Sequence, residues 1–526
     1  MNKIVILALL FNLLYSLIPE KRIVAEWEPA LGAMIRWPLG IPSNLVVELA
    51  EDDILYVLVE NTNQENSARN NFNSWNVNMG NVEFIFTETY SHWTRDHGPQ
   101  FLIGDNHWEV VNQQFNGYPV ENGCESNNNI MMTNKTKVEG RPLPSQSRGW
   151  EEDDDTNVDF ANQLNWDILD IPVYWTGGNF MTDGYGMGFS TELMINENNM
   201  DENQFINLIQ EYLNIDNYHI INNPNEESIQ HIDCMAKLVS PETIIIKQVS
   251  ELSPEYECIE EFANSFYELN TFYGRPFNIH RLYCPAIESG WWEVNSVAAY
   301  TNSLILNNKV LVPQYGISYD AEALNVYEEA MPGYEVIGFL NNTGNPWYAE
   351  DALHCRTMGI FNPHMIHISH KSIRTEELNS NESIYIEAYI IDYGDTNNNL
   401  ESVILNWKYS AEDGPYGQVE LELGLDNTYT GEFPNLNPNS TIEYFITATN
   451  NLGNSVNHPN AGWHLFNSTN SILGDINNDE IVNILDVILV VNIVLGIDDF
   501  DDLADINNDE SIDVLDVVQI VNIILN

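Results

Sequence analysis

The stretch Asp351-Ala352-Leu353-His354-Cys355-Arg356-Thr357 places a cysteine late in a long segment that alternates short β-rich runs with helical patterns. Two earlier stretches of this segment also carry reactive side chains, Trp93-Thr94-Arg95-Asp96 and His231-Ile232-Asp233. A thiol, an imidazole and two carboxylates are the groups needed for nucleophilic attack on a cationic, planar carbon. Cys355 taken alone reads more simply as a small core residue.

The neighbours of these groups favour a site for a cation. Positive charge next to a thiol lowers its pKa, so His354 and Arg356 are expected to favour a Cys355 thiolate. A carboxylate near an aromatic ring, as in Trp93 and Asp96, suits a guanidinium, because the ring stacks on the cation and the carboxylate forms bidentate hydrogen bonds. The alternative for Trp93-Thr94-Arg95-Asp96 is that Arg95 and Asp96 form a structural salt bridge.

Three further polar residues are candidates for the same site. If the stretch around His231 is a strand, the His231 and Asp233 side chains point to one face of it. Asn179 follows Gly177-Gly178 after a strand-like run and could line a pocket, although such a stretch alone is a turn. Asn302 enters an apolar run and could orient a substrate or the cysteine, or merely begin a strand.

Local patterns predict an α/β architecture for this segment. Apolar runs bounded by Gly, Asn or Pro read as strands, and apolar residues at helical spacing read as helices. The predicted strands include 54–59, 82–86, 243–246 and 304–306. The predicted helices are 204–213, with a cap near Asp201, and 256–269.

Length and charge set broad limits. A chain of 526 residues is expected to form three or more domains. With 19 Lys and Arg against 78 Asp and Glu, the formal net charge is −59, which would repel nucleic acid and anionic membranes and attract a basic ligand. The simpler explanation is that acidic, Asn-rich surfaces reflect the organism's habitat, so the charge only permits a cationic substrate.

The N-terminus predicts export. Residues 1–20 read as a signal peptide, since a short positive start at Asn2-Lys3 precedes an apolar run that is too short for a comfortable membrane span. The protein is therefore expected to be secreted, free or held at a cell surface or complex by its C-terminal module. The chain has five cysteines, so at least one is unpaired. Proximity suggests a bond between Cys258 and Cys284.

The C-terminal part changes character twice. Residues 371–468 hold short strand-like runs such as 383–391, 403–409 and 442–448, which predict an antiparallel, immunoglobulin-like or fibronectin-like sandwich acting as a spacer. Residues 469–526 contain a repeat in which 475–486 returns as 505–516.

Oxygen side chains fall at loop positions 1, 3, 5, 9 and 12 of both repeats, which is the calcium-ligand pattern of EF-hand loops. The alternative is a pair of acidic turns that cap helices. Glu480 and Glu510 depart from the usual loop glycine, and aspartate replaces glutamate at position 12. The predicted calcium ligands are Asp475, Asn477, Asp479, Ile481, Asn483, Asp486, Asp505, Asn507, Asp509, Ser511, Asp513 and Asp516.

This pair of loops, each followed by one helix, resembles the type I dockerin module over the whole tail. The resemblance implies a small α-helical, calcium-binding module whose partner is a cohesin-bearing scaffold protein. In dockerins, loop positions 10 and 11 carry much of the partner recognition. Here these positions are the apolar pairs Ile484-Leu485 and Val514-Leu515, which could form a contact surface or could be buried.

The segment before the sandwich resembles the agmatine deiminase and bacterial (Porphyromonas-type) peptidylarginine deiminase family over about residues 23–370. The motifs that carry the resemblance occur in family order: Ala25-Glu26-Trp27-Glu28-Pro29, Trp93-Thr94-Arg95-Asp96, Gly98-Pro99, Gly177-Gly178-Asn179, His231-Ile232-Asp233 and His354-Cys355. The resemblance implies a pentein propeller of five ββαβ-type units for a domain at 21–370, with the site in the central channel.

The resemblance also implies roles for residues. Cys355 is the nucleophile, His231 the general acid and base, and Asp96 and Asp233 hold the guanidinium. Trp93, Asn179 and Asn302 are expected near the substrate. The implied steps pass through a covalent thiouronium intermediate and need no metal or cofactor.

The substrate stays open. Agmatine enzymes of the family carry a glycine-rich run before the cysteine, and 351–357 replaces it here, which favours an arginine residue in a peptide, converted to citrulline and ammonia. The arginines that hold a peptide carboxylate in related bacterial enzymes are absent from 115–120. Agmatine or another free guanidino compound is the second hypothesis, and an inactive pentein that acts as a binding or scaffold component is the third.

Overall fold

The computed structural model describes residues 21–104, 107–117, 150–224, 231–287, 297–340, 344–349, 351–378, 383–395, 398–412, 414–437, 439–468, 474, 476–477, 481–497, 504–506 and 511–525. The chain divides into two compact units. The first comprises Met1–His367, Ile391–Asn399 and Asn460–Gly462, and the second comprises Ile368–Ile390, Leu400–Pro459 and Trp463–Asn526. The signal peptide predicted for 1–20 lies outside the described residues.

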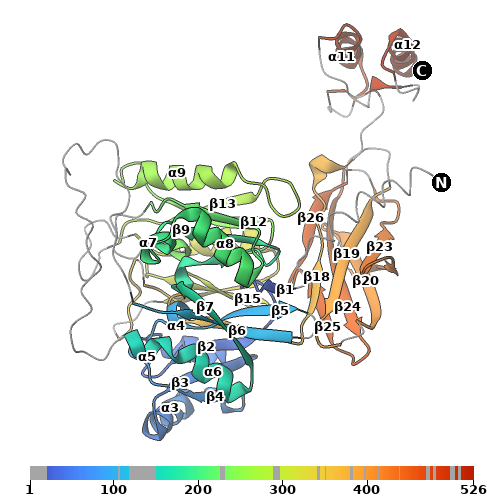
Figure 1. The fold of residues 1–526 in the computed structure, drawn as a ribbon. Coiled ribbons are helices and arrows are strands. Elements are labelled where there is room, and N and C mark those ends of the chain that lie inside the picture. The colour runs from blue at the N-terminus through green and yellow to red at the C-terminus, as the bar shows by residue number, and fades with distance from the viewer. Residues whose placement is uncertain are drawn as a thin grey trace. The chain divides into compact units, whose positions relative to one another are not determined.

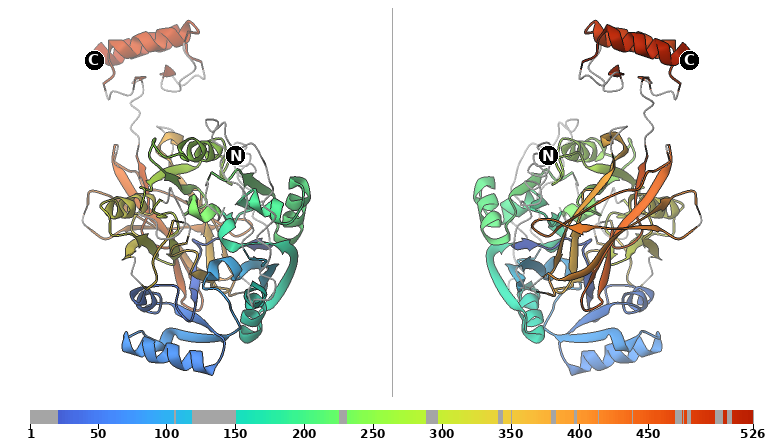
Figure 2. Two further views of the ribbon diagram at one scale, coloured as in Figure 1. Left: turned by 90° about the vertical axis from the view of Figure 1, so that its left-hand side faces the viewer. Right: turned by 90° about the vertical axis from the view of Figure 1, so that its right-hand side faces the viewer.

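The first unit is built from small sheets. Its described residues form five of them, and the helices lie around the outside of the strands (Figures 1 and 2). In spatial order the strands are β17 (Met358–Phe361), β2 (Ala30–Arg36), β3 (Ile54–Val59) and β4 (Val82–Phe86); β1 (Lys21–Ile23), β5 (Gln100–Gly104), β6 (His107–Gln114) and β7 (Asp167–Tyr174); β10 (Asn217–Ile221), β9 (Met187–Thr191) and β8 (Met181–Thr182); β11 (Ala236–Leu238), β12 (Thr243–Gln248) and β13 (Asn278–Tyr283); and β14 (Leu304–Leu306), β15 (Lys309–Gln314) and β16 (Glu335–Leu340).

One pairing pattern recurs in all five sheets. An antiparallel pair is followed by a parallel neighbour, as in β8–β9 and β9–β10, β11–β12 and β12–β13, and β14–β15 and β15–β16. A parallel pair needs a crossover, usually a helix, so the pattern is that of repeated ββαβ units. The prediction of five such units is confirmed. In the first sheet the antiparallel partner of β2 is β17, with Met358 opposite Met34, so the end of the unit pairs with its beginning.

The crossover helices follow from sequence patterns. Asp201 and Gln204 form a capping box at the start of α8, whose buried face carries Phe205, Ile209 and Leu213. This confirms the helix predicted over 204–213. The helices of this unit are α2 (Ser43–Leu49), α3 (Thr62–Ser74), α4 (Thr94–His97), α5 (Trp150–Asp154), α6 (Thr156–Leu164), α7 (Leu193–Glu197), α8 (Glu202–Leu213), α9 (Tyr256–Tyr267) and α10 (Asp320–Ala330), with the 3₁₀ turns η1 (Met79–Asn81), η2 (Gly177–Asn179) and η3 (Ile232–Cys234).

The four predicted strands of this unit are also confirmed. Strands β3 and β4 have the predicted bounds, and β12 and β14 contain or equal the predicted runs. Strand β3 is buried along nearly its whole length, as expected for a strand with parallel neighbours on both sides.

The described residues of the second unit form two sheets, and the pairs β19–β23, β22–β23, β20–β21, β20–β24, β24–β25 and β24–β26 are antiparallel. The predicted runs are strands β19, β20 and β24. Ring contacts join the two sheets, since Phe433, next to β23, packs against Tyr444 of β24 at 5.6 Å between centroids. The strands are β18 (Ile366–Ser369), β19 (Tyr385–Asp392), β23 (Thr428–Glu432) and β22 (Glu422–Leu423) in one sheet, and β21 (Gly417–Glu420), β20 (Leu400–Tyr409), β24 (Thr441–Asn450), β25 (Ser455–His458) and β26 (His464–Asn467) in the other; the turn η4 (Thr375–Glu377) lies between β18 and β19.

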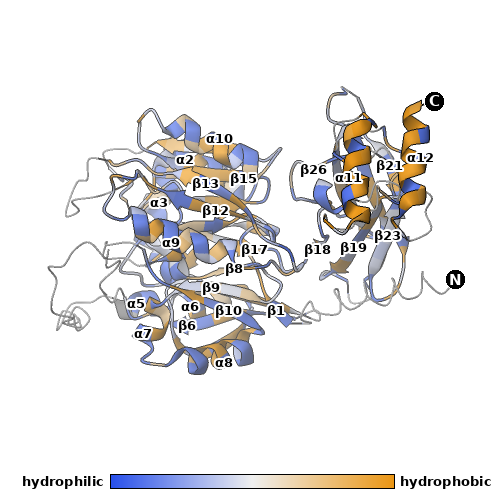
Figure 3. Cartoon of the chain, turned by 90° about the horizontal axis from the view of Figure 1, so that it is seen from above, coloured by the Kyte–Doolittle hydropathy of each residue, from blue (hydrophilic) through white to orange (hydrophobic). Residues whose placement is uncertain are grey.

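Two apolar helices end the chain, α11 (Ile484–Val494) and α12 (Val514–Leu525). They share a small core that includes Val487, Val490 and Ile520. Both helices are hydrophobic along most of their length (Figure 3). Several of these apolar side chains are exposed, among them Ile488 and Val518. Among the described residues, no helix combines the length and the apolar character that crossing a bilayer requires.

The cysteines differ from the pairing suggested by proximity. Cys258 is disulfide-bonded, whereas Cys234, Cys284 and Cys355 are buried and form no disulfide bond. A bond between Cys258 and Cys284 is therefore wrong. Cys124 lies outside the described residues.

Candidate active site

Cys355 lies between β16 and β17 and is only 2% exposed. The side-chain amide of Asn302 donates from Nδ2 to the Cys355 Sγ at 3.2 Å. Its Oδ1 accepts the backbone N–H of His354 at 2.9 Å and of Cys355 at 3.3 Å. The Cys355 carbonyl accepts the N–H of Arg95 at 3.1 Å. Two distant segments thus fix the thiol and its backbone.

Asp96 lies in the single-turn helix α4 and is also 2% exposed. Its Oδ1 accepts the backbone N–H of Gly178 at 3.1 Å. The turn η2 can come this close because of Gly177, where a Cβ would lie 2.1 Å from the carbonyl oxygen of Arg95. Arg95 pairs with Glu26 (Nη2–Oε2, 3.0 Å), so its ion pair leaves the Asp96 carboxylate to the site.

His231 and Asp233 lie at the turn η3, not on a strand, because the N–H of Cys234 bonds back to the carbonyl of His231 at 3.2 Å. Their side chains nevertheless reach the same place as Asp96. The His231 Nδ1 lies 3.6 Å from the Asp96 Oδ1, and the Asp233 Oδ2 lies 3.9 Å from the Cys355 Sγ.

Gly178 lies at the point where these groups converge. A Cβ built on it would lie 2.7 Å from the Asp96 Oδ1, 2.8 Å from the His231 Nδ1 and 3.1 Å from the Asp233 Oδ2. All three atoms would clash with or crowd a methyl group, so only glycine leaves this space open. We call this space the Gly178 notch.

The three residues predicted to lie near the substrate make different contacts in the structure. Asn302 is completely buried, contacts the Cys355 Sγ and also donates to the Asp233 Oδ2 at 3.1 Å, so it holds the thiol and the carboxylate together. Asn179 accepts through Oδ1 from the N–H groups of Thr191 (3.0 Å) and Ile232 (3.3 Å), which braces η3. Trp93 packs on His92, with centroids 4.9 Å apart, and its carbonyl accepts the N–H of Asp96.

The electrostatics of the thiol differ from the expectation. A hydrogen bond with Cys234 lowers the pKa of Cys355, but burial and the carboxylates of Asp233 and Asp96 raise it, and the pKa reaches about 11. Burial lowers the pKa of His231 to about 4. Near neutral pH in the ligand-free protein, the thiol is therefore protonated and the imidazole is neutral.

The prediction that Arg356 lowers the pKa of Cys355 is wrong, because the Arg356 guanidinium is bound by another carboxylate. Its guanidinium donates to both carboxylate oxygens of Asp351, at 2.6 Å from Nε and 2.7 Å from Nη2, and to the carbonyl of Gly40 at 2.7 Å. It also lies over the Trp347 ring. This pair closes the loop before Cys355 and neutralises the positive charge.

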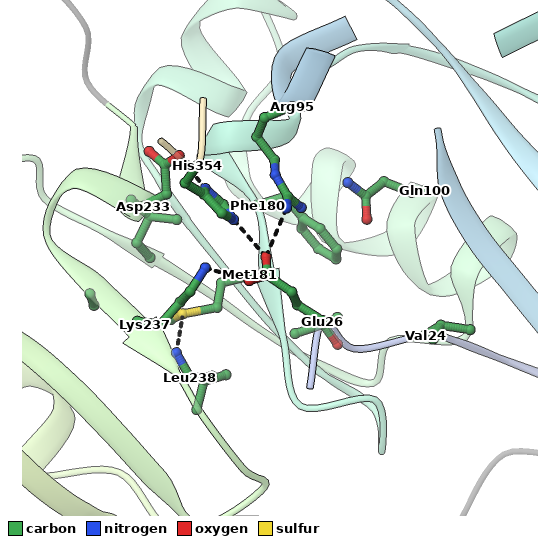
Figure 4. A pocket seen from close by; sticks show the side chains of 13 residues that line it. Val24, Glu26, Arg95, Gln100, Phe180, Met181, Asp233, Lys237, Leu238 and His354 are labelled. Atoms are coloured by element: carbon green, nitrogen blue, oxygen red, sulfur yellow. Dashed lines mark hydrogen bonds and ion pairs between the residues drawn. The ribbon is translucent and has the colours of Figure 1, made fainter. Parts of the chain in front are cut away.

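Sequence reasoning assigned no role to a charged cluster next to the site. Glu26 binds three cationic or polar side chains: Arg95, Lys237 and His354 (Figure 4). These residues and Asp233 line one cavity together with apolar side chains such as Phe180 and Met181. Glu26 occurs in a motif quoted above for the family resemblance, which was the one available signal.

Comparisons with known proteins identify the family of this chain. The sequence profile described as Porphyromonas-type peptidyl-arginine deiminase matches residues 22–360. The chain belongs to this family. As a member of the deiminase family, it is an amidine C–N hydrolase that acts on guanidino groups.

Curated relatives of this deiminase are named for agmatine, not for peptidyl-arginine. Putative agmatine deiminases of Lactococcus lactis and Enterococcus faecalis are 28% and 27% identical to it over 295 and 296 residues, covering 50% of this chain and 73% of each relative. A solved agmatine deiminase of E. faecalis (TM-score 0.53, 20% identity, 65% and 96% of the two chains) shares its fold. So does a putative arginine deiminase of Porphyromonas gingivalis (TM-score 0.51, 19% identity, 64% and 98%). The pentein-type fold therefore covers the first two thirds of this deiminase.

The predicted calcium ligands belong to the second unit and not to this site. The Asp486 carboxylate is fully buried and accepts the N–H groups of Ile476 (2.9 Å), Asn477 (3.1 Å) and Asn483 (2.8 Å). In the second repeat, Asp516 is equally buried and accepts from Asp513 at 2.8 Å. Asp475, Asp479, Asn507 and Asp509 lie outside the described residues. The described part of the chain contains no group of three or more His, Cys, Asp or Glu side chains arranged to hold a metal.

Proposed function

We propose that the first unit is a thiol-dependent deiminase in which Cys355 is the nucleophile, His231 the general acid and base, and Asp96 and Asp233 the guanidinium-binding pair. The convergence of Asp96, His231 and Asp233 on the Gly178 notch, with the thiol beside Asp233, carries this proposal. Two carboxylates facing one space suit a planar cation, because each can accept charge-assisted hydrogen bonds from it.

The reaction starts from a protonated thiol. Asp96 and Asp233 raise the pKa of Cys355, and a guanidinium bound between them offsets their charge and lowers that pKa again. The thiol proton passes to His231, and the Sγ bonds to the guanidinium carbon. The C–N bond then breaks as His231 returns its proton to the departing ammonia. Proton transfer of this kind contributes roughly 10²–10⁴-fold.

The second half of the reaction reverses these roles. The product of the first half is a thiouronium, in which the Cys355 sulfur is bonded to the amidino carbon. His231 removes a proton from water, and the resulting oxygen nucleophile attacks that carbon. The C–S bond breaks, the thiol is reprotonated and a ureido product leaves. Overall one water is consumed: its oxygen becomes the ureido oxygen, and one nitrogen of the guanidinium leaves as ammonia.

For the substrate, we propose a small guanidino compound of the agmatine type as the first candidate. The names of the relatives favour it over the peptidyl-arginine predicted from the sequence. The sequence argument rested on 351–357, where the structure pairs Asp351 with Arg356. That pairing is internal to the loop and supplies no contact specific to a peptide. An arginine residue in a peptide is the second candidate, because the family profile carries that name.

An assay of ureido product and ammonia from the full chain tests this proposal. Agmatine, free arginine, a peptide ending in arginine and a peptide with internal arginine are supplied separately at equal concentrations. The highest kcat/KM is expected for agmatine. A preference for either peptide would establish the second candidate, and no product from any substrate with a folded chain would leave the inactive, scaffold reading.

We propose that the second unit attaches a secreted enzyme to a scaffold. Its strands would form an immunoglobulin-like spacer, and the two repeats a type I dockerin that binds a cohesin domain. The pairs Ile484-Leu485 and Val514-Leu515, whose burial the sequence left open, are 54–64% exposed. Ile488 and Val518, one turn further along each helix, are 51% and 53% exposed. Two matching apolar patches 30 residues apart favour a contact surface.

Calcium is expected to bind both loops, because hard oxygen ligands suit it. Calorimetry on the full chain should show calcium binding that is lost in the Asp475→Ala, Asp505→Ala double variant. The matched control is Glu480→Ala with Glu510→Ala, which removes the same charge from the same loops at a position that is not a ligand. An unchanged isotherm in the first variant, or equal loss in both, would contradict the ligand assignment.

A further inference from the structure

The imidazole of His354 lies between two carboxylates. Its Nδ1 is 2.7 Å from the Asp233 Oδ2, and its Nε2 is 2.6 Å from the Glu26 Oε2. The residue is 4% exposed, so these contacts are made away from solvent. His354 immediately precedes Cys355 in the sequence. Its ring nevertheless bonds to Glu26 and to Asp233, the carboxylate that lies beside the Cys355 thiol.

The two partners determine the protonation of the ring. Burial raises the pKa of Asp233 and of Glu26, but cationic neighbours lower both by more: His354 first, then Lys237, with Arg95 also acting on Glu26. Glu26 also pairs with Arg95 and Lys237 independently of His354. An ionised carboxylate only accepts hydrogen bonds. Both ring nitrogens of His354 must therefore donate, which makes the ring an imidazolium.

Glu26 is itself fixed from several directions. Its Oε1 accepts from the Lys237 Nζ at 2.6 Å and from the N–H of Ile305 at 3.1 Å, and its Oε2 pairs with Arg95 at 3.0 Å. These partners come from β11, β14 and α4. The imidazolium is thus held by an anchor that spans three elements, and it cannot turn away from Asp233 without breaking a buried ion pair.

We propose that His354 is a positioning residue of the deiminase reaction, which as an imidazolium anchored by Glu26 keeps Asp233 ionised and directed at the guanidinium. This inference rests on the proposed function. A buried carboxylate without such a partner takes up a proton and loses its attraction for a cation. Four other ionisable groups lie near Asp233: the His231 imidazole, the Cys355 and Cys234 thiols, and the Lys237 ammonium, which pairs with Glu26 at 2.6 Å. Lys237 lowers the pKa of Asp233 through its charge, whereas His354 bonds the carboxylate directly at 2.7 Å.

The variant His354→Gln tests the proposal through its pH dependence. We expect kcat/KM at pH 7 to fall by about 10²-fold, by analogy with groups that orient metal ligands, whose loss costs about 10–100-fold. The ratio of variant to wild-type kcat/KM should recover at least tenfold between pH 6 and pH 9, because Asp233 ionises again as pH rises. A loss that is the same at every pH would show a merely structural role and overturn the proposal.

Two further variants separate anchoring from folding. Glu26→Gln removes the anchor and should show a smaller deficit with the same pH trend, and the double variant should be no worse than His354→Gln alone. The matched control is His367→Gln, since His367 is also buried and its Nδ1 also faces a carboxylate, that of Glu28 at 3.7 Å. It should lose stability without the pH-dependent deficit.

Two measurements need no turnover. Nitrogen NMR of histidine-labelled protein should contain one ring whose two nitrogens both carry a hydrogen bonded to a carboxylate, a signal that is absent from His354→Gln. Calorimetry should show that Cys355→Ser binds agmatine about tenfold more weakly, or weaker still, when His354→Gln is added. A neutral His354 ring, or unchanged binding, overturns the inference. Wild-type protein that forms no product but passes both measurements contradicts the proposed function alone.

Discussion

Cys355→Ser is expected to abolish ureido product, with kcat lowered by about 10⁴-fold or more. A serine hydroxyl in the same buried position ionises even less readily than the thiol, and it is the weaker nucleophile. The chain should stay folded, because serine keeps the size of the side chain. The measurement is product formation at saturating substrate, with thermal unfolding of the same sample as a check on folding.

Cys284→Ser is the matched control for this variant. Cys284 is likewise free and buried, and burial raises its pKa to about 11 as well. It should keep wild-type kcat. Acid-quenched wild-type enzyme should also carry the mass of the substrate less ammonia on the peptide that contains Cys355. Activity retained in Cys355→Ser, or an adduct on another residue, would remove Cys355 from its proposed role.

Gly178→Ala is expected to lower kcat/KM by about 10²-fold or more, because a displacement of about 1 Å at a reacting centre already costs this much. The new methyl group would occupy the Gly178 notch and push against the Asp96 and His231 side chains, which lie 2.7 and 2.8 Å from its position. Steady-state kinetics with the best substrate checks the expectation.

The control for Gly178→Ala is Gly359→Ala. Gly359 lies in β17, close to Cys355 in sequence, and a Cβ built on it meets no atom within 4 Å. This variant should retain wild-type kinetics. If Gly178→Ala is folded and equally active, the notch does not receive the guanidinium carbon and its nitrogens.

Local structure followed from local pattern. The bounds of β3 and β4 and the capped start of α8 could be predicted because each depends on residues within one turn or one strand. The pairing of β17 with β2 could not, because the partners are more than 300 residues apart and neither carries a local mark of the other. The turn at η3 also escaped prediction, since a His-Ile-Asp triplet reads equally well as a strand.

The candidate site was predictable in composition and not in electrostatics. Cys355, His231 and the two aspartates do lie together. The thiol pKa was expected to fall because Arg356 is adjacent in sequence, but Arg356 is neutralised by Asp351 and the thiol faces carboxylates. The links of His354 to Glu26 and Asp233 depend on three segments meeting in space, which no spacing reveals.

The pairing of β17 with β2 has a consequence for the order of synthesis. Asp96, His231 and Asp233 leave the ribosome long before Cys355. In the folded protein Met358, only three residues after the thiol, lies opposite Met34. The segment whose strand β17 pairs with β2, joining the end of the first unit to its beginning, is thus also the segment that contains the nucleophile. A nascent chain that has not reached this segment has neither the closing strand nor the thiol, so guanidine hydrolysis can begin only after β17 has been made and has paired with β2.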